Sequence, residues 1–101
     1  MPKLYEYLGL LIFFYSNEHE PIHIHARRGE EESKVEFFLE DGQITEVRFT
    51  TVGEKPPLSG RDLRNLKDLV KVYGDEIVRK WVDHFVYRKR FPPITITQRL
   101  S

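Results

Sequence analysis

The sequence predicts an α+β fold, in which an antiparallel β-sheet from the N-terminal half packs against two consecutive helices in the C-terminal half. Residues 8 to 50 show the alternation of apolar and polar side chains that is typical of strands, and residues 59 to 86 show the spacing of three to four that is typical of helices. Strands followed by helices are the usual order of elements in α+β proteins. Because 101 residues is the size of one ordinary domain, we expect residues 1 to 101 to form a single domain.

The composition excludes several functional classes. The 16 Lys and Arg residues balance the 16 Asp and Glu residues, so any contact with nucleic acid or with an anionic membrane has to be local. The chain has no cysteine, which excludes disulfide and thiolate chemistry and fits a reducing compartment. The apolar run from Leu8 to Tyr15 is much shorter than the ~20 residues that cross a bilayer. We therefore expect a cytoplasmic protein that does not contact the membrane.

The first strand is predicted at Leu8 to Tyr15, which has the nearly continuous apolar character of a buried central strand. After a polar turn that contains Pro21, residues 22 to 27 alternate strictly between apolar and polar side chains. Successive side chains of a strand point to opposite faces of the sheet, so the three apolar residues should face the core and the three polar residues should share the opposite, solvated face. The polar residues are His23, His25 and Arg27.

A hairpin is expected around the turn at residues 40 to 42. A two-residue loop would place Phe37 opposite Glu46, which wastes the core face of the sheet. A three-residue loop with its glycine in the left-handed conformation would instead place Val35 opposite Val47. We therefore predict the three-residue loop. The two strands of this hairpin are expected at residues 33 to 39 and 43 to 50.

Ser59 is expected to cap the first helix, because Ser59 and Asp62 have the spacing of a capping box. Gly74 suits the position just past the end of a helix, and Asp75 suits the cap of another. The sequence therefore predicts a break at these two residues and a second helix after them. The alternating tail at residues 94 to 97 predicts a short last strand.

The segment from Asn17 to Ala26 reads Asn-Glu-His-Glu-Pro-Ile-His-Ile-His-Ala, Gly29 follows it, and Trp81 lies in the second predicted helix. This pattern resembles the bacterial and archaeal family known as domain of unknown function 4160, whose members have an apolar strand followed by a Pro-x-His-x-His signature. The resemblance covers most of the chain, although members often have two prolines before the first histidine where this chain has Pro21 and Ile22. It implies a partner more than a reaction, because the genes of members often lie beside a gene for another small protein, as in toxin–antitoxin pairs.

Three interpretations of the histidine segment stay open, and the first two need no reaction. In the structural interpretation, His19, His23 and His25 hydrogen-bond a neighbouring loop or occupy a solvated strand face. In the metal interpretation, His23 and His25 bind one divalent ion such as zinc, with His19 or Glu20 as a third ligand. No cofactor is certain from the sequence.

The third interpretation is RNA processing. His23 and His25 would then act as general base and general acid, and Arg27 and Arg28 would hold the phosphate. The function we predict is one component of a toxin–antitoxin-like module that acts on RNA or through a small partner protein. The alternatives are a non-catalytic protein-binding module and a small metal-binding domain. We also expect a homo-oligomer, because the predicted sheet has an unpaired edge.

Overall fold

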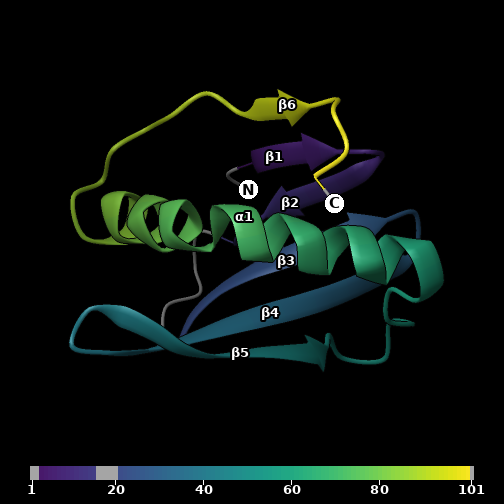
Figure 1. The fold of residues 1–101 in the computed structure, drawn as a ribbon, viewed down its shortest axis with the longest axis horizontal. Coiled ribbons are helices and arrows are strands. Elements are labelled where there is room, and N and C mark those ends of the chain that lie inside the picture. Colours follow the sequence, from purple (N-terminus) through teal and green to yellow (C-terminus); the bar gives the residue numbers. More distant parts are fainter. Residues whose placement is uncertain (1–2, 16–20, 101) are drawn as a thin grey trace.

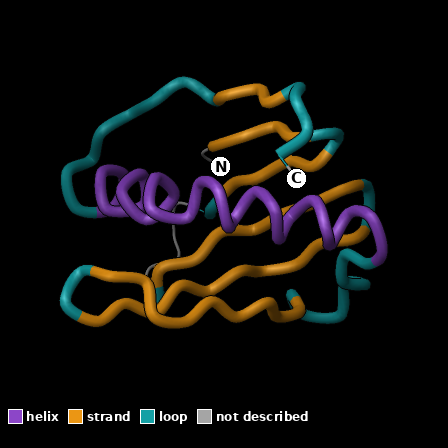
Figure 2. Tube along the Cα trace, viewed as in Figure 1, coloured by secondary structure: helices purple, strands orange, loops and turns teal. Residues whose placement is uncertain are grey.

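The computed structural model describes residues 3 to 15 and 21 to 100, and it places a helix against one face of a mixed β-sheet (Figures 1 and 2). The elements are β1 (Lys3–Tyr7), β2 (Leu10–Phe13), β3 (Ile22–Arg28), β4 (Glu31–Glu40), β5 (Gln43–Thr51), α1 (Gly60–Phe85) and β6 (Ile94–Ile96). The strand order across the sheet is β5-β4-β3-β2-β1-β6. All neighbouring strands are antiparallel except β1 and β6, which are parallel. The short last strand that the tail predicts is therefore present as β6.

The sequence predicts one strand at residues 8 to 15, but a tight turn occupies Leu8 and Gly9, and β2 covers only Leu10–Phe13 of this run. These two residues have φ values of +49° and +88°, and Tyr7 before the turn pairs with Leu10 after it. The φ of position 9 favours glycine, and a Cβ atom there would also lie 2.5 Å from the guanidinium of Arg28. The first strand of the sheet thus precedes the apolar run.

The prediction of two consecutive helices is wrong, because α1 is the single helix of the described residues and continues through Gly74 and Asp75. Gly74 is buried, and a Cβ atom on it would lie 3.5 Å from Ile44 and 3.9 Å from Phe37 of the sheet. Three residues later, the fully buried Ile77 continues the apolar stripe. Burying this continuous stripe outweighs the ~1 kcal/mol that a glycine costs inside a helix.

Replacing Gly74 with alanine is expected to raise the free energy of unfolding by about 0.5–1 kcal/mol. The added methyl group would meet its neighbours at ordinary van der Waals distances, and alanine loses less backbone entropy than glycine when a helix forms. Urea denaturation measures the change. Gly74→Leu is the control, because its larger side chain would overfill the same space and destabilise the fold. A less stable alanine variant would show that the space between Gly74 and the sheet does not admit a methyl group.

Ser59 occupies the N-cap of α1, as the sequence predicts, but its side chain makes no capping hydrogen bond. Asp62 does not complete a capping box either. Its carboxylate accepts a hydrogen bond of 2.9 Å from Nε of Arg28, which lies at the end of β3. Asp62 therefore connects the start of α1 to the sheet.

The β4–β5 hairpin has a two-residue loop, so the predicted three-residue loop is wrong. Asp41 and Gly42 both have positive φ, as a type I′ turn requires. A bulge at Thr45 then shifts the register, and Phe37 lies opposite Val47. The bulge in β5 thus keeps the apolar residues on the core face. The prediction obtained the same orientation from a three-residue loop.

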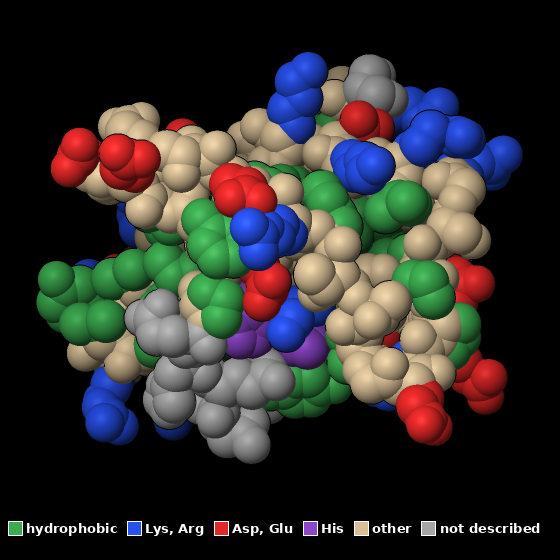
Figure 3. All heavy atoms as spheres, turned by 90° about the horizontal axis from the view of Figure 1, so that it is seen from below, with side chains coloured by type: hydrophobic (Ala, Val, Ile, Leu, Met, Phe, Trp, Pro, Cys, Tyr) green, Lys and Arg blue, Asp and Glu red, His purple; other side chains and the backbone are tan. Residues whose placement is uncertain are grey.

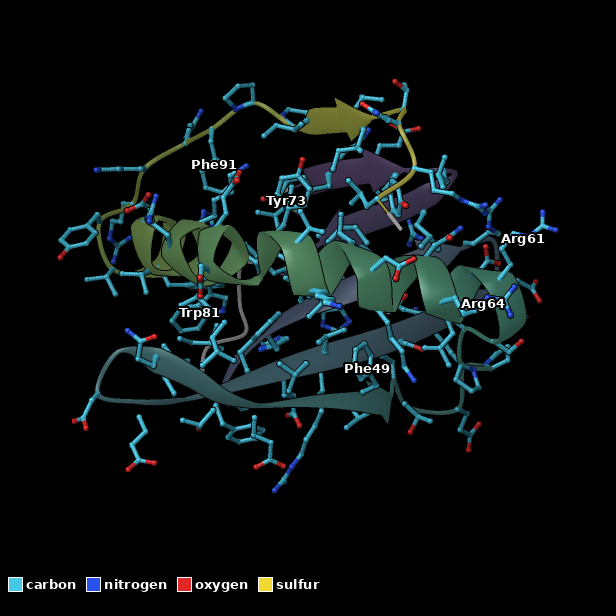
Figure 4. All side chains as sticks on the ribbon, viewed as in Figure 1. Phe49, Arg61, Arg64, Tyr73, Trp81 and Phe91 are labelled. Carbon is cyan, nitrogen blue, oxygen red and sulfur yellow. The ribbon has the colours of Figure 1, made fainter. Side chains whose placement is uncertain are left out.

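The hydrophobic core lies between α1 and the sheet, and Leu66 of α1 belongs to it. Trp81 of the same helix is also part of the core (Figure 4). Ile24 and Ala26 face this core from β3, and Tyr5 and Tyr73 pack their rings together at a centroid distance of 5.2 Å. In the described part of the chain, no helix has the length and apolar character that crossing a membrane requires.

Candidate functional site

β3 places His23 and His25 on the face of the sheet that points away from α1. Ile24 and Ala26, which alternate with them, lie in the core, so the two histidines share the opposite face as the alternation predicts. They are not solvated, however, because their exposed fractions are only 4% and 2%. The expectation of an exposed histidine face is therefore wrong, and the reason lies in the residues around them.

The carboxylate of Glu32 is the centre of a buried polar network on this face. Glu32 has no exposed surface, and its Oε2 accepts a hydrogen bond from Nδ1 of His25 at 3.0 Å. Its Oε1 accepts one from Nζ of Lys55 at 2.9 Å, and the hydroxyl of Tyr15 lies 3.5 Å from Oε2. Both oxygens of the buried carboxylate thus have partners, which burial of a charge requires. We call these four residues the Glu32 network.

The sequence patterns do not predict Glu32, Lys55 and Tyr15 as residues of the site. Glu32 belongs to a run of three glutamates that has the composition of a solvated loop, but it lies in β4 and pairs opposite Arg27. The tight turn at Gly29 between β3 and β4 is the signal that could have located it, because this turn fixes the register of the two strands. Lys55 gives no such signal, since it comes from a loop.

The loop between β5 and α1 is held at the start of β4. The backbone amide of Glu32 donates to the carbonyl of Pro56 at 2.9 Å, and the amide of Leu58 donates to the hydroxyl of Ser33, also at 2.9 Å. These bonds place Lys55 against Glu32. The hydrogen bond to Glu32 raises the pKa of Lys55 above its ordinary value, so the ammonium stays protonated.

Aromatic rings surround His25. The ring of Phe13 stacks on it at a centroid distance of 5.5 Å, and the ring of Tyr15 meets it edge-on at 4.6 Å. The imidazole of His23 lies 5.3 Å away, and its Nδ1 is 2.7 Å from the carbonyl oxygen of Pro21. Because a carbonyl oxygen only accepts, Nδ1 of His23 donates the hydrogen bond to Pro21.

The other predicted site residues lie in different places. The guanidinium of Arg27 lies 5.3 Å from the centre of the Phe13 ring, on the face of the histidines. Arg28 points to the opposite face, where it donates hydrogen bonds to the carbonyl of Leu8 and to Asp62. The structure thus brings His23, His25 and Arg27 together but not Arg28.

Only two of the four predicted metal ligands, His23 and His25, belong to the residues that the structure describes. His19 and Glu20 lie outside the described residues. Among residues 3 to 15 and 21 to 100, no three His, Asp or Glu side chains are grouped so that they could hold a metal ion.

A surface pocket of about 480 Å³ lies beside the Glu32 network. Arg27 and Lys55 line it together with the acidic residues Glu30 and Glu54. Figure 3 shows histidine side chains in purple with basic and acidic side chains next to them on the surface. The site therefore combines buried imidazoles with two cations at its rim.

The family model described as domain of unknown function (DUF4160) matches residues 9–82. No curated protein and no solved structure matches the chain. The matched residues run from the turn before β2 into the last third of α1, and they include both histidines of β3, Glu32 and Lys55. Because the match covers more than half of the chain, this protein belongs to the domain of unknown function 4160 family.

Proposed function

We propose that this chain is one component of a toxin–antitoxin-like module and that it acts on RNA at the site formed by His23 and His25. The observation that carries the proposal is the 3.0 Å hydrogen bond between Nδ1 of His25 and the buried carboxylate of Glu32. A carboxylate bound to Nδ1 fixes the tautomer and the orientation of an imidazole, as the third residue of a catalytic triad does. His25 is thereby prepared to accept a proton at Nε2.

The energetic cost of this arrangement also supports a functional role. Removing ionisable groups from water costs several kcal/mol, and apolar residues of similar volume often stabilise a fold at least as well as a buried ion pair. Glu32 and His25 are nevertheless buried together on the face of the sheet that α1 does not cover. A role in chemistry would account for groups that stability alone does not require.

The residues around Glu32 match the needs of RNA cleavage. In this reaction His25 takes the proton of a 2′-hydroxyl, the 2′ oxygen attacks the adjacent phosphorus, and the bond from phosphorus to the 5′ oxygen breaks. His23 gives a proton to the departing 5′ oxygen. Arg27 and Lys55, which line the neighbouring pocket, stabilise the negative charge that develops on the phosphate.

Glu32→Gln and His23→Gln are each expected to reduce the rate of cleavage of single-stranded RNA by about 10²- to 10⁴-fold. The unchanged protein should keep its activity in a chelator and show a bell-shaped pH profile. His84→Gln is the matched control, because His84 lies on α1 and packs against Phe14, away from Glu32. Circular dichroism establishes that each variant is folded. A chain that cleaves no RNA, alone or with the product of the neighbouring gene, would contradict the proposal.

The low exposure of both histidines favours a second candidate, in which the chain is a non-catalytic module that binds a small partner protein. Its contact surface would be the sheet face opposite α1, where Arg48 lies 4.8 Å from the ring centre of Phe38. This module would be favoured if the unchanged chain cleaves no RNA and variants of His23 lose partner binding. Variants that lose RNA cleavage and keep the partner would favour the enzyme.

A further inference from the structure

The segment that follows α1, from Val86 to Phe91, exposes apolar and basic side chains side by side; we call it the basic-aromatic turn. Val86 is 60% exposed and Tyr87 is 64% exposed, the highest values among the large apolar residues of the described part of the chain. Arg88, Lys89 and Arg90 are exposed as well. This surface has no role in the site formed by the histidines of β3.

Backbone hydrogen bonds hold the turn in one shape. The amide of Tyr87 donates to the carbonyl of Val82, and the amide of Lys89 donates to the carbonyl of Asp83 at 2.9 Å. Arg88 has a φ of +55°, which is a left-handed conformation. This conformation is energetically unfavourable for residues other than glycine. A loop that is fixed in such a conformation presents its side chains in a defined arrangement.

Phe91 anchors the far end of the turn by pointing back toward α1 (Figure 4). Its ring lies 6.4 Å from the ring of Phe14 and 5.4 Å from Nζ of Lys80. Phe14 is preceded in the chain by Phe13, which stacks on His25. The basic-aromatic turn and the histidine site therefore lie near the same end of β2 but on opposite faces of the sheet.

The three cations of the turn are not used within the fold. Among the described residues, Arg88, Lys89 and Arg90 form no ion pair, and Lys89 only approaches the ring of Tyr87, at 5.7 Å. A cation near the C-terminus of a helix complements the helix dipole, but this effect falls off within the last turn and does not explain an exposed tyrosine.

We infer that the basic-aromatic turn binds single-stranded RNA. The ring of Tyr87 offers a platform on which a base can stack, and the three cations beside it can contact successive phosphates. The choice of RNA rests on the proposed function, since the turn would hold the strand whose cleavage is assigned to His25. The overall charge of the chain is zero, so this local cluster supplies the attraction for the backbone.

Fluorescence anisotropy with a labelled single-stranded RNA tests the inference. Tyr87→Ala should weaken binding by about 5- to 150-fold, whereas Tyr87→Phe, which keeps the ring, should bind like the unchanged chain. Replacing Arg88, Lys89 and Arg90 together by alanine should make the plot of log K against log salt shallower by about 2.

The matched control replaces three exposed cations of α1 by alanine, namely Arg61, Arg64 and Lys71. Arg61 and Arg64 lie at the opposite end of the helix from Phe91 (Figure 4). This variant should bind RNA with nearly unchanged affinity and salt dependence.

The outcomes separate this inference from the proposed function. RNA binding that depends on Tyr87 without any cleavage would support the turn and contradict the proposed reaction. The inference would be overturned if neither Tyr87→Ala nor the alanine variant of Arg88, Lys89 and Arg90 changes RNA cleavage or RNA binding. The proposed reaction would not be contradicted by that result. Absence of RNA binding, or equal losses in the control variant, would also overturn it.

Discussion

Leu66→Ala is expected to lower the free energy of unfolding by about 2–5 kcal/mol. The side chain of Leu66 is fully buried between α1 and the sheet, so its removal leaves a cavity in addition to the lost transfer free energy. Val72→Ala is the matched control on the same helix, because Val72 is 54% exposed and the change should stay within about 0.5 kcal/mol. Urea denaturation of both variants measures the difference. Equal effects at the two positions would show that α1 does not pack on the sheet through Leu66.

Glu32→Ala is expected to cost about 3 kcal/mol, because it leaves the buried His25 without the acceptor of its Nδ1 proton. The loss should not reach the upper end for buried ion pairs, since Lys55 is half exposed and can turn to water. Glu46→Ala is the control on the neighbouring strand. The ion pair of Glu46 with Arg48 is solvent-exposed, so its loss should cost less than about 1 kcal/mol.

A double-mutant cycle identifies the partner that is responsible for the loss. If the hydrogen bond between Glu32 and His25 carries the effect, the loss in the variant that lacks both side chains should be smaller than the sum of the two single losses by about 0.5–3 kcal/mol. Additive losses would mean that the two side chains contribute independently. The stabilising role of the Glu32 network would then have to come from Lys55 or Tyr15.

Local patterns in the sequence predict those features that depend on neighbours along the chain. The alternation from Ile22 to Arg27 assigns His23 and His25 to the correct face because that rule needs only the geometry of one strand. Ser59 is located as the N-cap for the same reason, since its neighbours in sequence determine the start of a helix.

Features that depend on distant residues escape the same reasoning. Gly74 has the pattern of a helix end, but it is buried inside α1 next to Phe37 and Ile44 of the sheet, and this packing continues the helix past it. The burial of His25 depends on Tyr15 and on Glu32, and the charge of Glu32 is in turn matched by Lys55 from a loop. No local rule relates these positions, so the sequence predicts the histidine pair but not its surroundings.

The pairing of β1 with β6 has a consequence for the order in which the chain assembles. A hydrogen bond from the amide of Leu100 to the hydroxyl of Tyr7 joins residues 93 positions apart, and Tyr5 pairs with Ile94 in the same region. Closing a loop of this length costs more chain entropy than closing any hairpin in the sheet. The outer edge of β1 therefore stays open to other extended chains until α1 has docked and brought β6 across, which makes the newly synthesised N-terminal hairpin the segment most in need of protection from aggregation.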